Sequence, residues 1–261
     1  MKMEEIQIIG GSIKEKLENT KFAIHVIGKA WEYTWMNGFR IIVSEMLDLK
    51  PGDKVLDVGC GDGWFSIQNA LKHPDVEFLG VDLFEAQEAE EISKLIGVEN
   101  CKFYEMDALN MNIREKVDHV VLFMVLGNIC ENSSDIEKLF RKCWEIMKDG
   151  ANLLIVEAFE EDFPREIRGK LRKLYELYRE MGKSHGEDKE TILSRKVVLT
   201  ILRNIGFKKL KTTLKSFEWY MVEEEVKRYF GFEELPFKIP EKFWVFDKPK
   251  QVTIIIAMKK V

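Results

Sequence analysis

Residues 55–64 read "VLDVGCGDGW", and in this stretch an apolar run ends abruptly in three glycines within five positions. Glycine in a tight turn indicates either a positive φ angle or a group that approaches the backbone closely. A helical pattern of apolar residues resumes at Trp64. The stretch therefore predicts a buried strand, a glycine loop and a helix, which is the opening of a βαβ unit.

Other short aliphatic runs repeat the pattern on both sides of this stretch. The amphipathic segments 64–72 and 135–147 alternate with strand-like runs at 54–59, 76–82, 101–107, 119–127 and 152–159. Strands that are buried on both faces read as continuous aliphatic runs, as these do. The sequence therefore predicts an α/β fold with a doubly wound, mostly parallel sheet.

The chain is predicted to hold one large domain with additions. Residues 1–50 form an N-terminal helical cap segment in this interpretation, and residues 51–261 form the main domain. The rhythm of strands and helices changes in two places, at about 160–191 and 223–250, which are predicted to be insertions. At 261 residues with 46% hydrophobic composition, the chain is long enough to bury a substantial core.

Composition excludes several classes of protein. No apolar run approaches the roughly 20 residues that a membrane-crossing helix needs, and the acidic start does not resemble a secretory signal, so we expect a cytoplasmic protein with no membrane partner. The four cysteines are widely separated and no CxxC pair occurs, which predicts neither a metal site nor disulfides. Four glutamines beside abundant Lys and Glu favour a thermophilic source.

Acidic residues follow three successive predicted strands. Asp57, Asp82 and Asp107 lie at the strand ends, and the carboxyl ends of parallel strands are where open α/β sheets bind ligands. The glycine spacing G-x-G-x-G differs from the G-x-G-x-x-G of a dinucleotide site and from a P-loop. A carboxylate at the end of the second strand is well placed to accept hydrogen bonds from ribose hydroxyls. The alternative is that these acids are solvated turn residues and helix caps.

These motifs together resemble the class I S-adenosylmethionine-dependent methyltransferases. "LDVGCGDG" is similar to the first motif of that family, "VDLF" to the second and "MDAL" to the turn near the adenine. The resemblance covers residues 51–159 and extends to the last helix and strand, "LRNIGFKKLK" and "VTIIIAMKK". It implies a seven-stranded sheet with an antiparallel last strand and helical lid insertions. It also implies a methyltransferase whose cofactor is S-adenosylmethionine.

The resemblance also assigns cofactor contacts. It places the loop backbone from Gly59 to Gly63 against the methionine part of the cofactor, Asp57 near its ammonium and Asp82 on the ribose. Asp107 and Ala108 would flank the adenine. An aromatic of the N-terminal segment is a further candidate, with core packing as the alternative. The predicted cofactor-binding residues are Asp57, Gly59, Cys60, Gly61, Gly63, Asp82, Leu83, Asp107, Ala108 and Tyr33.

Few residues are candidates for the transfer itself. His185 lies in a loop of the first insertion and is a candidate base, although a surface histidine is the alternative. Asn128 and Glu157, at the ends of the fourth and fifth strands, are candidate contacts to the methyl acceptor. The chain lacks the N-P-P-[YF] tetrad of amino-directed DNA and glutamine methyltransferases, and residues 126–128 lack the acid typical of aminopropyl transferases.

The nature of the acceptor stays open at this point. A small molecule enclosed by the first insertion as a lid is the leading interpretation. Methylation of RNA, such as tRNA, or of protein is the alternative, because residues 165–215 hold 15 Lys and Arg against 6 Asp and Glu. A third possibility is a cofactor-binding protein without catalysis. The acceptor atom is not specified, and a homo-oligomer is compatible with the sequence.

Overall fold

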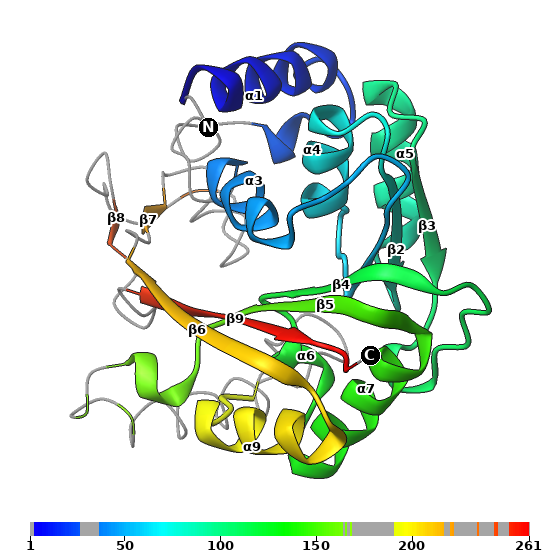
Figure 1. Ribbon diagram of the computed structural model, residues 1–261. Helices are drawn as coiled ribbons and strands as arrows, with labels where there is room; N and C mark the ends of the chain where they lie inside the picture. Colours follow the sequence, from blue (N-terminus) through cyan, green and yellow to red (C-terminus); the bar gives the residue numbers. More distant parts are fainter. Residues whose placement is uncertain are drawn as a thin grey trace.

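The computed structural model describes residues 3–26, 37–163, 165, 168, 191–216, 220–221, 234, 243–244 and 251–260. Within these residues the helices, with 3-10 turns written η, and the strands alternate along the chain (Figure 1). The helical elements are α1 (Met3–Leu17), η1 (Ala23–His25), α3 (Asn37–Ser44), η2 (Glu45–Leu47), α4 (Trp64–Lys72), α5 (Ala86–Ile96), η3 (Ala108–Asn110), α6 (Leu126–Ile129), α7 (Ser133–Ile146), η4 (Glu160–Asp162) and α9 (Arg195–Ile205). The strands are β1 (Lys54–Val58), β2 (Glu77–Asp82), β3 (Cys101–Glu105), β4 (Val117–Phe123), β5 (Met147–Glu157), β6 (Lys208–Ser216), β7 (Tyr220–Met221), β8 (Phe243–Trp244) and β9 (Gln251–Met258).

The main sheet has seven strands in the order β3-β2-β1-β4-β5-β9-β6. Strands β1 to β5 pair in parallel, whereas β9 runs antiparallel to both β5 and β6. The predicted mostly parallel sheet with an antiparallel last strand is therefore confirmed. The chain winds outward from β1 to β3 and then returns to place β4 on the other side of β1, so the topological switch point lies between β1 and β4.

Helices cover both faces of this sheet (Figure 1). Helices α1, α3, α4 and α5 lie on one face, and α6, α7 and α9 lie on the other. Each layer has its own cluster of buried apolar side chains. The cap segment contributes Ile13, Leu17 and Val43 to the same cluster as Val55 and Phe78 of the sheet, so it shares a core with the main domain. Across the described parts of the chain, no helix combines the length and apolarity needed to span a bilayer.

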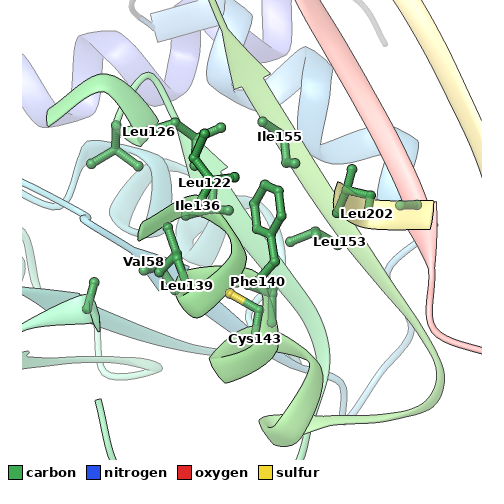
Figure 2. Close-up of a cluster of buried hydrophobic side chains, with 14 of the residues drawn as sticks. Val58, Leu122, Leu126, Ile136, Leu139, Phe140, Cys143, Leu153, Ile155 and Leu202 are labelled. Atoms are coloured by element: carbon green, nitrogen blue, oxygen red, sulfur yellow. The ribbon is translucent and has the colours of Figure 1, made fainter. Parts of the chain in front are cut away.

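Figure 2 shows the cluster beneath α7, where the ring of Phe140 points toward β5. Leu153 and Ile155 of β5 line one side of it, and Leu202 of α9 lies close by. Phe140 is fully buried, and burial of a side chain of this size contributes about 1.5–3 kcal/mol to folding. This cluster holds α7 and α9 to the sheet and so sets the position of the loops that follow β4 and β5.

Two boundaries differ from the sequence expectation for physical reasons. Helix α7 begins at Ser133 because the Asn132 side chain accepts hydrogen bonds from the backbone N–H groups of Ser134 and Asp135. Strand β4 ends at Phe123 rather than near residue 127, because Met124 has a φ of 55°. A left-handed residue interrupts the ladder, and the aliphatic run continues as the short helix α6.

Candidate functional site

The site is built where the topology reverses, at the carboxyl ends of β1, β2 and β4. Pairing aligns Val58 of β1 with Val81 of β2, and Asp57 with Val121 of β4. The loops that leave these three strands therefore emerge side by side at one edge of the sheet. Such an edge is the usual place for a ligand in an open α/β sheet.

The glycine loop is tied to β2 by backbone hydrogen bonds. The N–H groups of Gly59 and Cys60 both donate to the carbonyl of Val81, at 2.8 and 3.1 Å. Gly61 N–H donates to Oδ2 of Asp82 at 3.0 Å, and Gly63 N–H closes the turn on Cys60. The loop is thus held in one conformation by the strand beside it, with its next residue at the start of α4.

Asp82 accepts hydrogen bonds from three backbone amides. Its Oδ1 receives the N–H groups of Phe84 and Glu85 at 2.9 and 3.0 Å, while its Oδ2 receives Gly61 N–H. The carboxylate is only partly buried, so its remaining lone pairs stay open to a ligand. Asp82 therefore joins the β2 turn to the glycine loop and presents an anionic edge to the site.

Asp57 lies beneath the loop rather than on its surface. Its side chain is 1% exposed, and Ser66 of α4 donates a hydrogen bond to it at 2.9 Å. Burial raises the pKa of Asp57 to about 7, although the hydrogen bond from Ser66 and the charge of Arg40 act in the opposite direction. A cation brought close to this group would favour its ionised form.

The purine side of the predicted site is formed by the segments after β2 and β3. Asp107 caps the short helix η3 by accepting from Leu109 N–H at 2.8 Å, and Ala108 is buried behind it. Leu83 and Phe84, in the turn after Asp82, are 41% and 55% exposed. Exposed apolar side chains can pack against the flat face of a nucleoside base, and a neighbouring carboxylate can accept hydrogen bonds from its ribose.

Glu157 has a clear structural task at the end of β5. Its two oxygens accept from the N–H groups of Leu126 and Ala158, both at 2.9 Å, which anchors the start of α6. Burial raises the pKa of Glu157 to about 7, against the effect of these backbone bonds. Asn128 lies on α6 and is exposed. The two predicted acceptor contacts are thus brought to the same corner of the site.

Two of the predicted site residues are not described by the structure. His185 and Tyr33 lie outside the described residues, so their predicted roles stay predictions. In the described ranges, no group of three His, Cys, Asp or Glu side chains is arranged to hold a metal ion. Cys60 points toward Gly80, and burial raises the pKa of its thiol well above the usual range.

Sequence reasoning did not predict that two residues of the N-terminal segment lie against the loop. Arg40 of α3 is 9% exposed, stacks at 5.4 Å over the ring of Phe123 and interacts electrostatically with Asp57 and Asp62. His25 of η1 lies against Asp62 of the loop. Nothing in the spacing of these residues indicates their proximity, because α3 and η1 reach the loop only through tertiary packing.

The glycines of the loop differ in what approaches them. A Cβ on Gly59 (φ 68°) would lie 2.2 Å from Cγ2 of Val125, the residue before α6, whereas a Cβ on Gly61 (φ 53°) would meet only the flexible end of Glu85, at 3.0 Å. Part of the glycine requirement therefore comes from the protein's own packing. Gly61 leaves room on its exposed side for a ligand.

We expect Gly59→Ala to lower the free energy of unfolding by about 2–4 kcal/mol, because it combines backbone strain with overpacking against Val125. Gly61→Ala carries the same left-handed strain without the clash, and we expect a loss of about 1 kcal/mol. Urea denaturation of both variants measures the difference. Equal losses of unfolding free energy in the two variants would show that the Val125 side chain moves aside without an energetic cost.

Comparison with known proteins agrees with this geometry. The profile of a family described as a methyltransferase domain matches residues 49–220, which include every strand from β1 to β6. The chain is 32% identical over 113 residues to phosphoethanolamine N-methyltransferase 3 of Arabidopsis thaliana, covering 43% of this chain and 22% of that protein. It is 32% identical over 102 residues to ribosomal RNA small subunit methyltransferase G of Porphyromonas gingivalis, covering 38% and 43%.

A solved structure extends the similarity of the fold. Phosphoethanolamine N-methyltransferase 2 of Haemonchus contortus, in complex with phosphomonomethylethanolamine and S-adenosylhomocysteine, superimposes with a TM-score of 0.60 at 15% identity, over 95% of this chain and 60% of that one. This chain spans less than half of the length of the two curated relatives, from Arabidopsis thaliana and Porphyromonas gingivalis. Because the family match covers more than half of this chain, the protein belongs to the methyltransferase domain family and is a class I, Rossmann-like enzyme that uses S-adenosylmethionine.

Proposed function

We propose that this enzyme methylates a small molecule enclosed between the sheet edge and the insertion after β5. The observation that carries the proposal is the closed stem of this insertion. The two chain segments that bound it, residues 160–163 and 191–196, are hydrogen-bonded to each other and to the site. We propose that an insertion anchored in this way at the carboxyl edge encloses a small acceptor.

The stem is held by a buried polar cluster. Asp162 has a fully buried side chain and accepts from Thr253 of β9 and from Arg195 of α9, at 2.8 and 3.0 Å. Glu161 caps α9 by accepting from Ser194 Oγ and from Arg195 N–H, both at 2.8 Å. Buried groups that satisfy one another in this way hold one geometry. The base of the insertion is therefore fixed to the sheet.

The second segment of the stem, residues 191–196, contacts α6 at the site. Thr191 N–H donates to the carbonyl of Gly127 on α6 at 2.8 Å. A Cβ on Gly127 would lie 2.3 Å from the Thr191 carbonyl oxygen, so the two backbones are packed against one another. Since Glu157 anchors the same helix, the insertion, α6 and the end of β5 meet at one corner. This contact supports an acceptor site there.

S-adenosylmethionine, when bound, supplies a methyl group already activated on a sulfonium. The task left to the chain is to hold the acceptor in line and to exclude water. We propose that Asp82 and Leu83 bind the ribose, that Asp107 and Ala108 bind the adenine, and that Asp57 stabilises the ammonium. The backbone of Gly59, Cys60, Gly61 and Gly63 would line the methionine part.

Residues for the acceptor side are proposed from the same corner. Asn128 is exposed on α6 and offers both a donor and an acceptor. Glu157, with a pKa raised by burial to about 7, can take a proton near neutral pH, and it also orients α6. His185 and Tyr33 complete the proposed set from the sequence. A cytoplasmic location, a thermophilic source and a homo-oligomer are likewise proposals from the sequence.

The test uses cofactor with a labelled methyl group and fractionated extract from the source organism. Label entering the low-molecular-mass fraction supports the proposal, and mass spectrometry of that fraction then identifies the acceptor atom. Label confined to RNA or protein contradicts it. Heat-treated enzyme is the control for label transferred by other components of the extract.

A second candidate, methylation of RNA, is favoured by one observation. Edge strand β6 exposes four lysines, and α9 adds Lys196, so the described part of the basic segment presents positive charge to solvent. Exposed lysines also protect an edge strand from pairing with other chains. Charge reversal at Lys208, Lys211 and Lys215 distinguishes the two roles. A shift of tRNA at low salt that the triple variant abolishes supports RNA.

We expect Thr253→Val to lower the free energy of unfolding by about 1–3 kcal/mol, because it removes the hydroxyl that donates to the buried Asp162 carboxylate and accepts from Arg195. Thr212→Val, in the exposed part of β6, is the matched control and is expected to stay within about 0.5 kcal/mol of the native protein. Urea denaturation at neutral pH measures both. No difference between them would mean that the stem does not depend on this hydroxyl.

A further inference from the structure

The imidazole of His25 lies between two carboxylates of different elements. Its Nε2 is 2.6 Å from Oε1 of Glu88 on α5, and its Nδ1 is 3.3 Å from Oδ2 of Asp62 in the glycine loop. The side chain of His25 is only 4% exposed, whereas those of Asp62 and Glu88 are 28% and 43% exposed. His25 therefore connects the N-terminal segment to the loop and to α5 at one buried point.

The two contacts fit the doubly protonated form of the imidazole. Ionised carboxylates only accept hydrogen bonds, and a neutral imidazole has a single N–H to donate. Only the doubly protonated imidazolium can donate to Asp62 and Glu88 at once, and hydrogen bonds between ionised partners are about twice as strong as neutral ones. The ring centroids of Phe22 and Trp64 lie 6.1 and 6.0 Å from that of the imidazole, whose side chain is buried.

Asp62 lies within the loop that is predicted to receive the methionine part of the cofactor. It stands between Gly61, whose N–H donates to Asp82, and Gly63, where α4 begins. The buried Arg40 of α3 also interacts electrostatically with the same carboxylate. Two cationic side chains of the N-terminal segment thus converge on one loop residue, and its position determines that of the glycines on either side.

We propose that His25 is a positioning residue that holds the glycine loop in its cofactor-binding conformation by bridging Asp62 to Glu88. His25 does not touch the reacting atoms in this assignment. Its effect is to reduce the ordering that the loop must undergo when the cofactor binds. The proposal concerns cofactor affinity alone, so it stands or falls independently of the identity of the methyl acceptor.

The experiment measures the Kd of S-adenosylhomocysteine by calorimetry for the native protein, His25→Gln and Asp62→Asn. Glutamine keeps one donor but cannot bridge, and we expect binding about tenfold weaker at pH 5.5, toward the low end of usual coupling between sites. Asp62→Asn leaves the buried ring in place and is expected to cost a similar factor. The double variant is expected to lose no more than either single variant.

The matched control is Lys21→Gln. Lys21 forms an ion pair with Glu91 of α5, so this variant also removes a charge contact between the N-terminal segment and α5 but leaves the loop untouched. We expect its Kd to equal that of the native protein. If Lys21→Gln weakens binding as much as His25→Gln, general loosening of the segment explains the loss and the proposal is wrong.

A pH profile separates bridging from packing. The charged groups around the imidazole are Asp62 from the loop, Glu88 from α5 and Arg40 beyond Asp62, with the pair of Lys21 and Glu91 on the same two elements. The ratio of Kd values for His25→Gln and native protein is expected to fall as the pH rises, because a neutral imidazole has one N–H and cannot donate to both carboxylates. A ratio that rises with pH, or a double variant with fully additive losses, overturns the proposal.

Discussion

Relative to an Asp57→Asn variant, the native protein is expected to lose roughly 25-fold in affinity for S-adenosylhomocysteine between pH 7.5 and pH 5.5. The reason is that burial raises the pKa of Asp57 to about 7 in the free protein. If the ammonium of the ligand favours the ionised carboxylate, binding below this pKa must first remove a proton. Affinity is then complete above pH 7 and falls about tenfold for each pH unit below it.

The comparison with Asp57→Asn cancels the titration of every other group, including His25. Asparagine keeps the shape of the side chain and an oxygen that can accept from Ser66. Calorimetry at pH 6 in two buffers with different ionisation enthalpies counts the protons released on binding. We expect nearly one proton to be released per ligand bound. A native protein whose affinity follows that of the variant across this range would remove Asp57 from the ammonium contact.

Asp82→Ala is expected to weaken cofactor binding by a factor of about 100 or more, because it removes charge-assisted hydrogen bonds that are each worth about 1.5–3 kcal/mol. The loss has two sources. The carboxylate is proposed to hold the ribose hydroxyls, and it also accepts the N–H of Gly61 and those of Phe84 and Glu85. Calorimetry measures the loss of cofactor affinity. Thermal unfolding of the free protein measures how far the loss of the three backbone hydrogen bonds destabilises the loop.

Glu105→Ala is the matched control for this experiment. Glu105 ends β3, pairs in register with Asp82 and is exposed, so its removal deletes an acid from the neighbouring strand end without touching the loop. We expect native affinity for this variant. The affinity of Asp82→Asn, which keeps one carbonyl oxygen, is expected to lie between those of Asp82→Ala and Glu105→Ala. An affinity for Asp82→Ala within a factor of about three of the native value would contradict the ribose assignment.

Most of the fold could be predicted because its signals are local. The boundaries of α4 match the expected segment 64–72, and Asp57, Asp82 and Asp107 were found from their place at the ends of aliphatic runs. The predicted end of β4, at residue 127, was wrong. The residues "MVLG" continue the aliphatic run, and the sequence does not indicate the left-handed backbone at Met124.

The details of the site were less accessible for a physical reason. Whether an acid after a strand faces solvent or lies beneath the loop depends on helix packing, and Ser66 reaches Asp57 only once α4 is folded onto the sheet. His25 and Arg40 approach the loop from residues far earlier in the chain. The hydrogen bonds of Glu157 to the start of α6 likewise depend on a turn at 124–125 that the pattern did not predict.

The closed stem after β5 has a consequence for how the protein can change over evolution. Because Glu161 and Asp162 tie residues 160–163 to α9 and β9, the chain between positions 163 and 191 begins and ends on a fixed frame. We expect changes in its length and sequence to leave this frame in place. The frame is therefore a suitable grafting point for a designed segment that gives the enzyme a new acceptor.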